Sequence, residues 1–236
     1  IFRLNIYGES HGKQVGVLID GCPAGLQLTE DDFTNDLLRR KSGAKGTTPR
    51  IEDDKPEILS GVFNNTTTGA PILIAFKNKN TKSEDYQQLY EFPRPGHADF
   101  TARFKFGGFN DYRGGGHFSG RLTLGLVAAG VIAKKLIHPV NISGNLIEAG
   151  GDSNINKAIE NALNNNDSIG GIVECKAEQV PVGLGEPFFN AVESLISHIV
   201  FSIPAIKGIE FGSGFQAAKM LGSEHNDSIA DSRGRT

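Results

Sequence analysis

The pattern of hydrophobic residues predicts four β-strands and one helix in the first third of the chain. The strands are expected at residues 1–7, 15–20, 58–63 and 71–76, and turns containing Gly, Pro or Thr separate them. The helix is predicted after Thr29, which can cap it, with an apolar stripe of Phe33, Leu37 and Leu38. The first two strands flank a loop with the sequence GESHG at residues 8–12.

A long loop region and a buried helix are predicted in the middle of the chain. Apolar periodicity weakens between residues 78 and 116, where charged, aromatic and Gly residues mix as they do in functional loops. Ser119 can then cap a helix over residues 122–136, which is apolar on nearly every side. We expect this helix to be central and buried.

The last part of the chain predicts a second set of strands and helices. Strands are expected near residues 140–148 and 169–180, a helix at 155–163, and a long amphipathic helix that opens at Pro187. Residues 17–26 and 172–184 both run from a strand into a Pro-x-Gly-Leu sequence, which indicates internal pseudo-symmetry of two halves. Because no linker rich in Pro or Ser separates the halves, a single domain over residues 1–236 is predicted.

Composition and charge narrow the classes of partner. The chain has 236 residues, of which 38% are hydrophobic, and a formal net charge of −3. Nucleic acid and anionic membranes favour basic surfaces, so neither is expected as a partner. The longest apolar stretch, residues 124–133, is too short to cross a bilayer, and the first residues lack a signal sequence, so we expect a cytoplasmic location. Cys22 and Cys175 form neither a disulfide framework nor a zinc spacing, and no metal site is predicted.

A basic run lies at residues 39–50. It contains Arg39, Arg40, Lys41, Lys45 and Arg50 and no acidic residue. A solvated basic face would explain such a run. However, Gly and Thr residues are interspersed, a mixture that suits a loop folding over phosphate or carboxylate oxygens. The sequence therefore predicts a small polyanion as the ligand.

Two histidines in Gly-containing loops are candidates for proton transfer near an anion. His11 follows the first predicted strand, and His97 lies close to Arg94 in the long loop region. A lone histidine is more often structural, but imidazole titrates near neutral pH and so suits acid–base chemistry. His117 is a third candidate, whereas the remaining histidines have no such surroundings.

A possible dinucleotide fingerprint occurs near the end of the chain. Residues 212–217, GSGFQA, match its GxGxxA form. The residues that follow are polar and include no second strand ending in an acidic residue, so we interpret the motif as a chance match. A genuine motif would indicate a nicotinamide-dependent oxidoreductase, which transfers hydride without releasing phosphate.

Eight motifs occur in order along the chain and together resemble those of the chorismate synthase family. They are GESHGKQVGVLIDGCPAG at residues 8–25, RR at 39–40, TTPR at 47–50, EILSGVF at 57–63, TTGAPI at 67–72, RPGHAD at 94–99, DYRGGG at 111–116 and GLGEP at 183–187. Chance does not explain agreement over so many ordered motifs.

The resemblance implies a fold, a reaction and a cofactor. The fold would be α+β, with helices sandwiched between two antiparallel β-sheets, assembled as a homotetramer. The enzyme would be a carbon–oxygen lyase acting on phosphates, which converts 5-enolpyruvylshikimate-3-phosphate to chorismate by an anti-1,4-elimination. This is the last common step of the shikimate pathway to the aromatic amino acids. Reduced FMN would be required, and NADPH would serve only as its reductant.

The resemblance also implies roles for individual residues. His11 would protonate the departing phosphate, and His97 would contact the reduced flavin and set its protonation. The phosphorylated substrate would be held by Ser10, Arg40, Arg50, Arg94 and Arg121. The flavin would further contact Phe118, Ser119, Gly120 and Arg121.

The chain departs from the family pattern in two places. Residues 114–123 read GGGHFSGRLT where the family commonly has GGGRSSARET. The sequence also ends at Thr236, before the family's NAGG, KPT and RHDP-type segments, so we expect it to lack a C-terminal part of the domain. The alternative function is a non-catalytic anion-binding or assembly protein derived from the same fold, which measured turnover would separate from the lyase.

Overall fold

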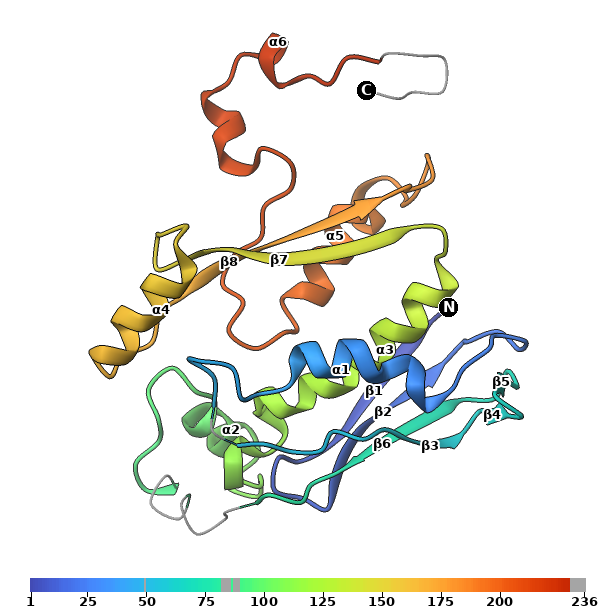
Figure 1. The fold of residues 1–236 in the computed structure, drawn as a ribbon, viewed down its shortest axis with the longest axis vertical. Coiled ribbons are helices and arrows are strands. Elements are labelled where there is room, and N and C mark those ends of the chain that lie inside the picture. The colour runs from blue at the N-terminus through green and yellow to red at the C-terminus, as the bar shows by residue number, and fades with distance from the viewer. Residues whose placement is uncertain (49, 82–85, 87–89, 230–236) are drawn as a thin grey trace. The chain divides into compact units, whose positions relative to one another are not determined.

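The computed structural model describes residues 1–48, 50–81, 86 and 90–229, which form two compact units, Ile1–Val180 and Pro181–Thr236 (Figure 1). The first unit is built on a four-stranded antiparallel sheet in the order β1-β2-β6-β3. These strands span Arg3–Gly8 (β1), Gln14–Asp20 (β2), Ile72–Lys77 (β6) and Glu57–Ser60 (β3). The four strands predicted in the first third of the chain are therefore confirmed.

One of those strands is divided. Gly61, with a φ of +79°, ends β3, and the chain continues into a small hairpin of β4 (Val62–Phe63) and β5 (Thr66–Thr67). The Thr- and Gly-containing turn expected between the third and fourth predicted strands thus begins with a short strand, β5. A positive φ is tolerated best by glycine, which explains the position of the break.

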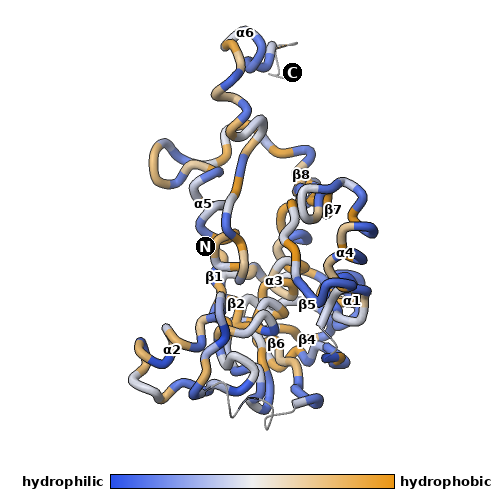
Figure 2. Tube along the Cα trace, turned by 90° about the vertical axis from the view of Figure 1, so that its left-hand side faces the viewer, coloured by the Kyte–Doolittle hydropathy of each residue, from blue (hydrophilic) through white to orange (hydrophobic). Residues whose placement is uncertain are grey.

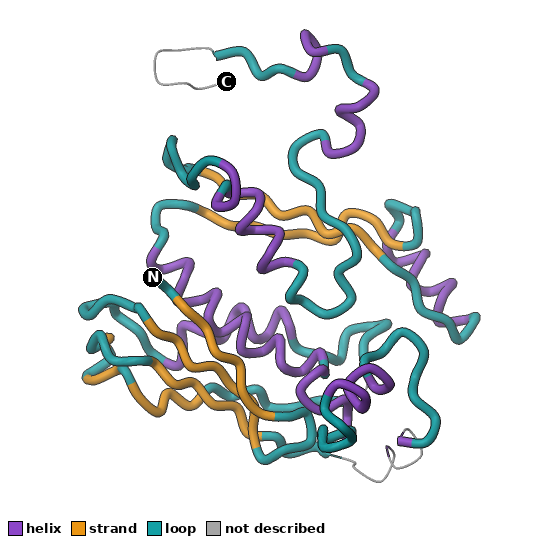
Figure 3. Tube along the Cα trace, turned by 180° about the vertical axis from the view of Figure 1, so that it is seen from behind, coloured by secondary structure: helices purple, strands orange, loops and turns teal. Residues whose placement is uncertain are grey.

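Helices cover one face of the sheet (Figure 3). They are the turn η1 (Glu30–Phe33), which continues into α1 (Thr34–Arg40), and the turn η5 (Gly120–Leu122), which continues into α3 (Thr123–Leu136). Thr29, the predicted cap of the first helix, forms a capping box with Asp32. Gly125 lets α3 approach the sheet closely, since a Cβ atom at this position would lie 3.2 Å from Gly16 O.

The core between the sheet and these helices consists of large apolar side chains with no exposed surface. They are Val15, Val17, Ile19, Ile72, Ile74 and Phe76 from the sheet and Phe33, Leu124 and Ile132 from the helices. Burial of each contributes roughly 1.5–3 kcal/mol. The hydrophobic stretches of β2, β6 and α3 accordingly lie together (Figure 2).

The sequence predicted that the region between residues 78 and 116 is a long loop, but the structure places a helix in it. It contains α2 (Asp99–Lys105), and a turn, η4 (Arg113–Phe118), follows. Apolar periodicity did not reveal α2 because only Ala102 is buried, whereas Phe100 and Phe104 are exposed. Helix prediction from an apolar stripe fails where the stripe has no core to face.

The first unit ends in a two-stranded antiparallel sheet. It pairs β7 (Asn141–Ala149) with β8 (Gly171–Glu178), and α4 (Ile155–Asn164) lies between them in sequence. All three elements were predicted. Every residue of β8 is exposed. Helices and antiparallel sheets together make an α+β protein, and no helix in the described part of the chain is long and apolar enough to cross a membrane.

The prediction of one long helix that opens at Pro187 is wrong. The chain forms a short turn, η6 (Phe188–Asn190), becomes extended at Ala191 (ψ 150°), and only then enters α5 (Val192–Val200). A hydrogen bond from Glu186 N to Asn190 O closes a local turn that a continuous helix would not allow. Two further short helices, η7 (Gly214–Lys219) and α6 (Gly222–His225), follow.

Candidate active site

Ser10 and His11 lie in the loop between β1 and β2. Only 1% and 7% of their surfaces are exposed. A hydrogen bond from Gly12 N to Glu9 O (3.0 Å) tightens the loop, and the Ser10 amide donates to Gly116 O (3.0 Å). The end of this strand pair therefore carries a buried serine and a buried histidine, held against the Gly-rich turn at residues 114–116.

His97 is held in place by contacts with Arg94 and Asp99, which belong to the same short segment. Its Nδ1 lies 2.7 Å from Asp99 Oδ1, and the Arg94 guanidinium donates to the same carboxylate through Nε (2.7 Å) and Nη2 (2.9 Å). Gly96 turns the chain between them with a φ of +69°. An Nδ1–H group that donates to the carboxylate leaves Nε2 as the acceptor of the ring.

Two adjacent glycines bring these histidines to one place. A Cβ atom at Gly114 (φ +60°) would lie 2.6 Å from His11 Nε2. A Cβ atom at Gly115 (φ +82°) would lie 2.9 Å from His97 Nε2. Both imidazoles therefore lie against neighbouring residues of one backbone turn, and side chains at these positions would displace them.

The ring of Tyr86 also connects the two histidine loops. It packs at right angles to His11, with ring centroids 4.9 Å apart. The Arg94 guanidinium lies 5.7 Å from the centre of the same ring, within the range of a cation–π interaction. Two contacts with one aromatic ring further restrict the separation of the two loops.

The electrostatic surroundings favour a neutral His11. Its pKa is lowered, first by burial and then by repulsion from Arg50 and Arg113, while Asp111 and Glu52 act in the opposite direction. An anion bound beside the ring would favour the protonated imidazolium and so raise this pKa. Anion binding and protonation of His11 are therefore coupled.

Arg40 and Arg121 share one buried carboxylate. Arg40 Nη1 lies 3.2 Å from Asp54 Oδ2, and Arg121 Nη1 lies 2.8 Å from Asp54 Oδ1. Asp54 is 5% exposed and Arg121 8%. Arg40 also donates to Gly120 O (3.3 Å), so the end of α1, residue 54 and the start of η5 are joined at one point.

Arg50 is held by a second carboxylate and reaches the serine. It donates to Glu52 Oε1 through Nε (3.1 Å) and Nη2 (2.7 Å), to Ser10 Oγ (2.9 Å) and to Ser10 O (3.0 Å). Burial acts to raise the pKa of Glu52, but hydrogen bonds from Arg50 and from the amides of Lys79 and Asn80 outweigh it, and the pKa is lowered. Glu52 therefore stays ionised and keeps Arg50 in place.

Asn78 joins the arginine pair to the His11 loop. Its Oδ1 accepts a hydrogen bond from Arg121 Nε (2.6 Å), and its Nδ2 donates to Glu9 O (3.1 Å) and Gly12 O (2.9 Å). These two carbonyls flank Ser10 and His11. All five predicted substrate-binding residues thus lie on one connected set of contacts, which includes the Gly114–Gly115 turn.

Two guanidinium nitrogens in this set are buried and have no hydrogen-bond partner among the described residues. They are Arg40 Nε and Arg121 Nη2. A buried N–H group without a partner costs free energy, roughly 1–3 kcal/mol, more when the group is charged. Such donors fit an anionic ligand that would complete their hydrogen bonds.

The predicted flavin contacts lie beside the arginine pair. Ser119 Oγ accepts a hydrogen bond from the Arg121 amide (3.3 Å), and Gly120 O accepts one from Arg40. Phe118 is 37% exposed and packs near Phe106. His117, the third histidine candidate, contacts Gly8 O through Nδ1 (2.9 Å) and is exposed.

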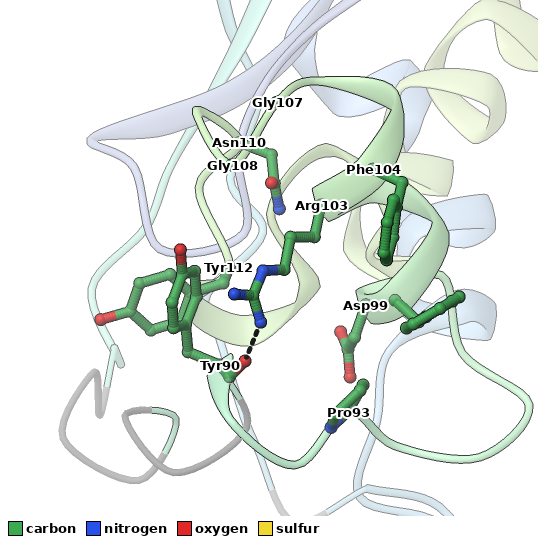
Figure 4. Close-up of a pocket in the computed structure, with 10 residues that line it drawn as sticks. Tyr90, Pro93, Asp99, Arg103, Phe104, Gly107, Gly108, Asn110 and Tyr112 are labelled. Carbon is green, nitrogen blue, oxygen red and sulfur yellow. Dashed lines mark hydrogen bonds between the residues drawn. The ribbon is translucent and has the colours of Figure 1, made fainter.

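An open cavity of about 530 Å³ adjoins the His97 segment on the side of Asp99 (Figure 4). Arg103 points into it, 4.5 Å from the centre of the Tyr90 ring, and donates to Tyr90 O (3.2 Å). None of the site residues predicted from the sequence lines this cavity. Asp99, which holds Arg94 and His97, does line it, so the cavity adjoins the cluster at this carboxylate.

The acidic and amide residues of the cluster were not predicted from the sequence; they are Glu52, Asp54, Asn78 and Asp99. The predicted site consisted mainly of cations and histidines, whereas these four residues act by holding the cations and histidines in place. One signal was present, since Glu52 and Asp54 alternate around the exposed Asp53 next to a basic run. The GxGxxA match at residues 212–217 overlaps the start of η7, and the described residues 181–229 contain no strand. Among the described residues, no group of three or more His, Cys, Asp or Glu could hold a metal ion.

Fold and site define an α+β protein with a candidate anion site built from arginines and histidines. The model of the chorismate synthase family matches residues 2–236. Chorismate synthase of Chitinophaga pinensis is 64% identical over 237 residues, covering 100% of this chain and 71% of the relative. That of Methanocaldococcus jannaschii is 42% identical over 271 residues, covering 97% and 71%. A solved structure described as chorismate synthase has a TM-score of 0.74 at 26% identity and covers 97% of this chain and 73% of that chain.

The chain belongs to the chorismate synthase family. Its function is that of a lyase, which eliminates phosphate from 5-enolpyruvylshikimate-3-phosphate to give chorismate for aromatic amino acid biosynthesis.

Proposed function

We propose that the cluster around the Gly114–Gly115 turn is the active site of this elimination and that it requires reduced FMN. The observation that carries the proposal is the convergence of two histidines and four arginines, with two buried guanidinium nitrogens left without partners. An anionic substrate supplies the acceptors that these nitrogens lack. The reaction expels phosphate and removes one hydrogen from carbon as a proton, the departing phosphate takes up one proton, and there is no net oxidation, so the protein must bind several negative charges and move protons.

The arginines bind and orient the substrate. Arg50 acts with Ser10, and Arg40 acts with Arg121, so two groups of donors reach the site from different elements. Charge-assisted hydrogen bonds from such groups contribute roughly 1.5–3 kcal/mol each. Arg94 adds a further cation beside His97. The phosphate and carboxylates of the substrate are thereby fixed in one orientation.

His11 gives a proton to the departing phosphate. Its pKa is lowered by burial and by the nearby arginines, which makes the imidazolium a stronger acid. The phosphate dianion, once bound beside the ring, restores protonation, and loss of the C–O bond then consumes the proton. Its Nε2 lies against Gly114, where a side chain would displace the ring.

His97 and the segment at residues 118–121 are proposed to hold the flavin. When bound, reduced FMN supplies a transient electron that assists phosphate departure. The donors of this chain fit such an anionic partner, because Arg121 Nη2 is buried without an acceptor next to Ser119 and Gly120. Asp99 fixes the His97 ring, whose Nε2 then sets the protonation of the flavin. We propose that NADPH acts only as a reductant.

We further propose two sheets around the helices, pseudo-symmetry of the two halves, and a homotetramer, as the family resemblance implies. Support for assembly comes from large apolar side chains that are exposed on β7 and β8. They include Leu146, Ile147, Ile172 and Val173. Surfaces of this kind are commonly covered in assemblies.

The experiment is anaerobic phosphate release from 5-enolpyruvylshikimate-3-phosphate, with reduced FMN, with oxidised FMN and without flavin. Release is expected only with reduced FMN, and bound flavin is expected to be detected by titration. Release without any flavin would refute the cofactor proposal. Substrate binding without phosphate release under every condition would instead support a non-catalytic anion-binding protein.

A further inference from the structure

Asp54 occupies an unusual position beneath the arginine pair. It is 5% exposed, and its two carboxylate oxygens are divided between Arg40 (3.2 Å) and Arg121 (2.8 Å). These arginines come from the end of α1 and from η5, which are far apart in sequence. A single planar group therefore sets the separation of two guanidinium groups that approach from different elements.

The backbone of Asp54 supports this interpretation. Its φ is +53°, in the left-handed region that non-glycine residues seldom adopt. Residues held there cost of order 1–3 kcal/mol and persist where the surroundings fix them, often at functional sites. The three consecutive acidic residues differ in their environment. Asp53 is exposed and pairs with Lys79, whereas Glu52 and Asp54 are buried and pair with arginines.

The net charge of the arginine cluster is positive, which favours an anionic ligand. Arg40, Arg50 and Arg121 carry three positive charges, against two negative charges on Glu52 and Asp54. One net positive charge remains, and Arg40 Nε and Arg121 Nη2 still lack acceptors. The carboxylate thus holds Nη1 of both arginines, while Arg40 Nε and Arg121 Nη2 are left to bind an anion.

We propose that Asp54 is a positioning residue, which fixes the spacing and orientation of Arg40 and Arg121 for the phosphorylated substrate. This inference rests on the proposed function of the arginine cluster. It differs from charge balance alone, because the two explanations predict opposite results when the negative charge is removed. Charge balance predicts that anions bind more tightly without the carboxylate, since the local positive potential rises. Positioning predicts that the substrate binds more weakly, since one arginine loses its anchor.

The test compares Asp54→Asn, Asp54→Glu and the control Asp53→Asn. Asparagine keeps the shape and tolerates the left-handed backbone, but it offers one arginine an NH2 group instead of an acceptor. Glutamate keeps the charge and moves it outward by one methylene. Steady-state phosphate release with reduced FMN gives KM and kcat, and thermal denaturation reports folding.

Both Asp54 variants are expected to raise KM by about 10- to 100-fold, the loss of one charge-assisted hydrogen bond. The fall in kcat should be smaller, because uniform substrate binding is what is lost. Asp53→Asn should retain the KM of the unchanged protein. A KM for Asp54→Asn that is unchanged or lower overturns the proposal, and so does an unchanged KM for Asp54→Glu.

A double-mutant cycle with Arg40→Ala keeps the proposal falsifiable if one substitution impairs folding. Asp54 acts through Arg40 and Arg121, so Asp54→Asn should raise KM less in the Arg40→Ala background than alone. Full additivity would contradict the proposal. If the unchanged protein itself releases no phosphate, the proposed function fails. If it is active and the Asp54 variants resemble Asp53→Asn, only this inference fails.

Discussion

The strand pairs β2–β6 and β7–β8 are both antiparallel and were both predicted from the sequence, yet they have opposite environments. Val15, Val17 and Ile19 of β2 have no exposed surface, whereas every residue of β8 is exposed, Val173 to 67%. The difference lies in what packs against each pair, since α1 and α3 cover the β2–β6 sheet. Local sequence therefore decides that a strand forms, and packing decides what it contributes to stability.

The proposed site belongs to the well-packed region. Ser10 and His11 follow β1, Asn78 follows β6, and Arg121 begins the helix that covers the sheet. Rigid elements hold side chains to tighter tolerances than an exposed ribbon does, which suits a reaction that needs several charges in fixed positions. Substitutions in the packed β2–β6 region are therefore expected to affect stability and turnover, whereas substitutions in the exposed β7–β8 pair are expected to affect neither strongly.

The largest expected effect is on the core of the packed pair. Phe76→Ala in β6 should lower the free energy of unfolding by about 3–5 kcal/mol, because it removes a fully buried aromatic side chain and leaves a cavity. Within a single chain, the smaller change Val173→Ala in β8 should alter it by less than about 0.5 kcal/mol, because Val173 is 67% exposed there. Chemical denaturation followed by circular dichroism measures both. Equal losses at the two positions would remove the contrast between the strand pairs.

A second prediction concerns two glycines with similar backbones. Gly114→Ala should destabilise the protein by roughly 1–3 kcal/mol and reduce turnover, because φ is positive and the new Cβ would lie 2.4 Å from the His11 ring. Gly151, after β7, also has a positive φ, of +80°, but nothing lies within 4 Å. Gly151→Ala should therefore share the backbone strain and keep the activity. Equal activity of both variants would show that Gly114 does not place His11.

The smallest effect is on the pH dependence of stability. Burial, Arg50 and Arg113 lower the pKa of His11 in the folded protein. Below the unfolded value of about 6.5 the unfolded chain binds more protons, so stability falls as pH decreases to the lowered folded pKa and is unaffected above 6.5. Denaturation at several pH values should show a shallower fall in His11→Asn. An identical slope in both proteins would contradict the lowered pKa.

The sequence predicted the strands, the helix caps, the buried helix α3 and the cations, because each depends on neighbouring residues. It missed α2, whose two Phe side chains are exposed, and the break at Ala191, which depends on the turn at Glu186. It also missed Asp54, which lies 67 residues from Arg121. Such a pairing arises from tertiary contacts, which a pattern along one chain does not record.

The most direct test of the proposed site is phosphate release by His11→Asn under anaerobic conditions with reduced FMN. A positioned acid contributes roughly 10²–10⁴-fold to a rate, so release should slow by this factor. Affinity for reduced FMN and the melting temperature should change little, because the loss is of proton transfer. An unchanged rate would contradict the assignment of His11 as the proton donor, and a slow rate accompanied by loss of folding and flavin binding would show a structural role instead.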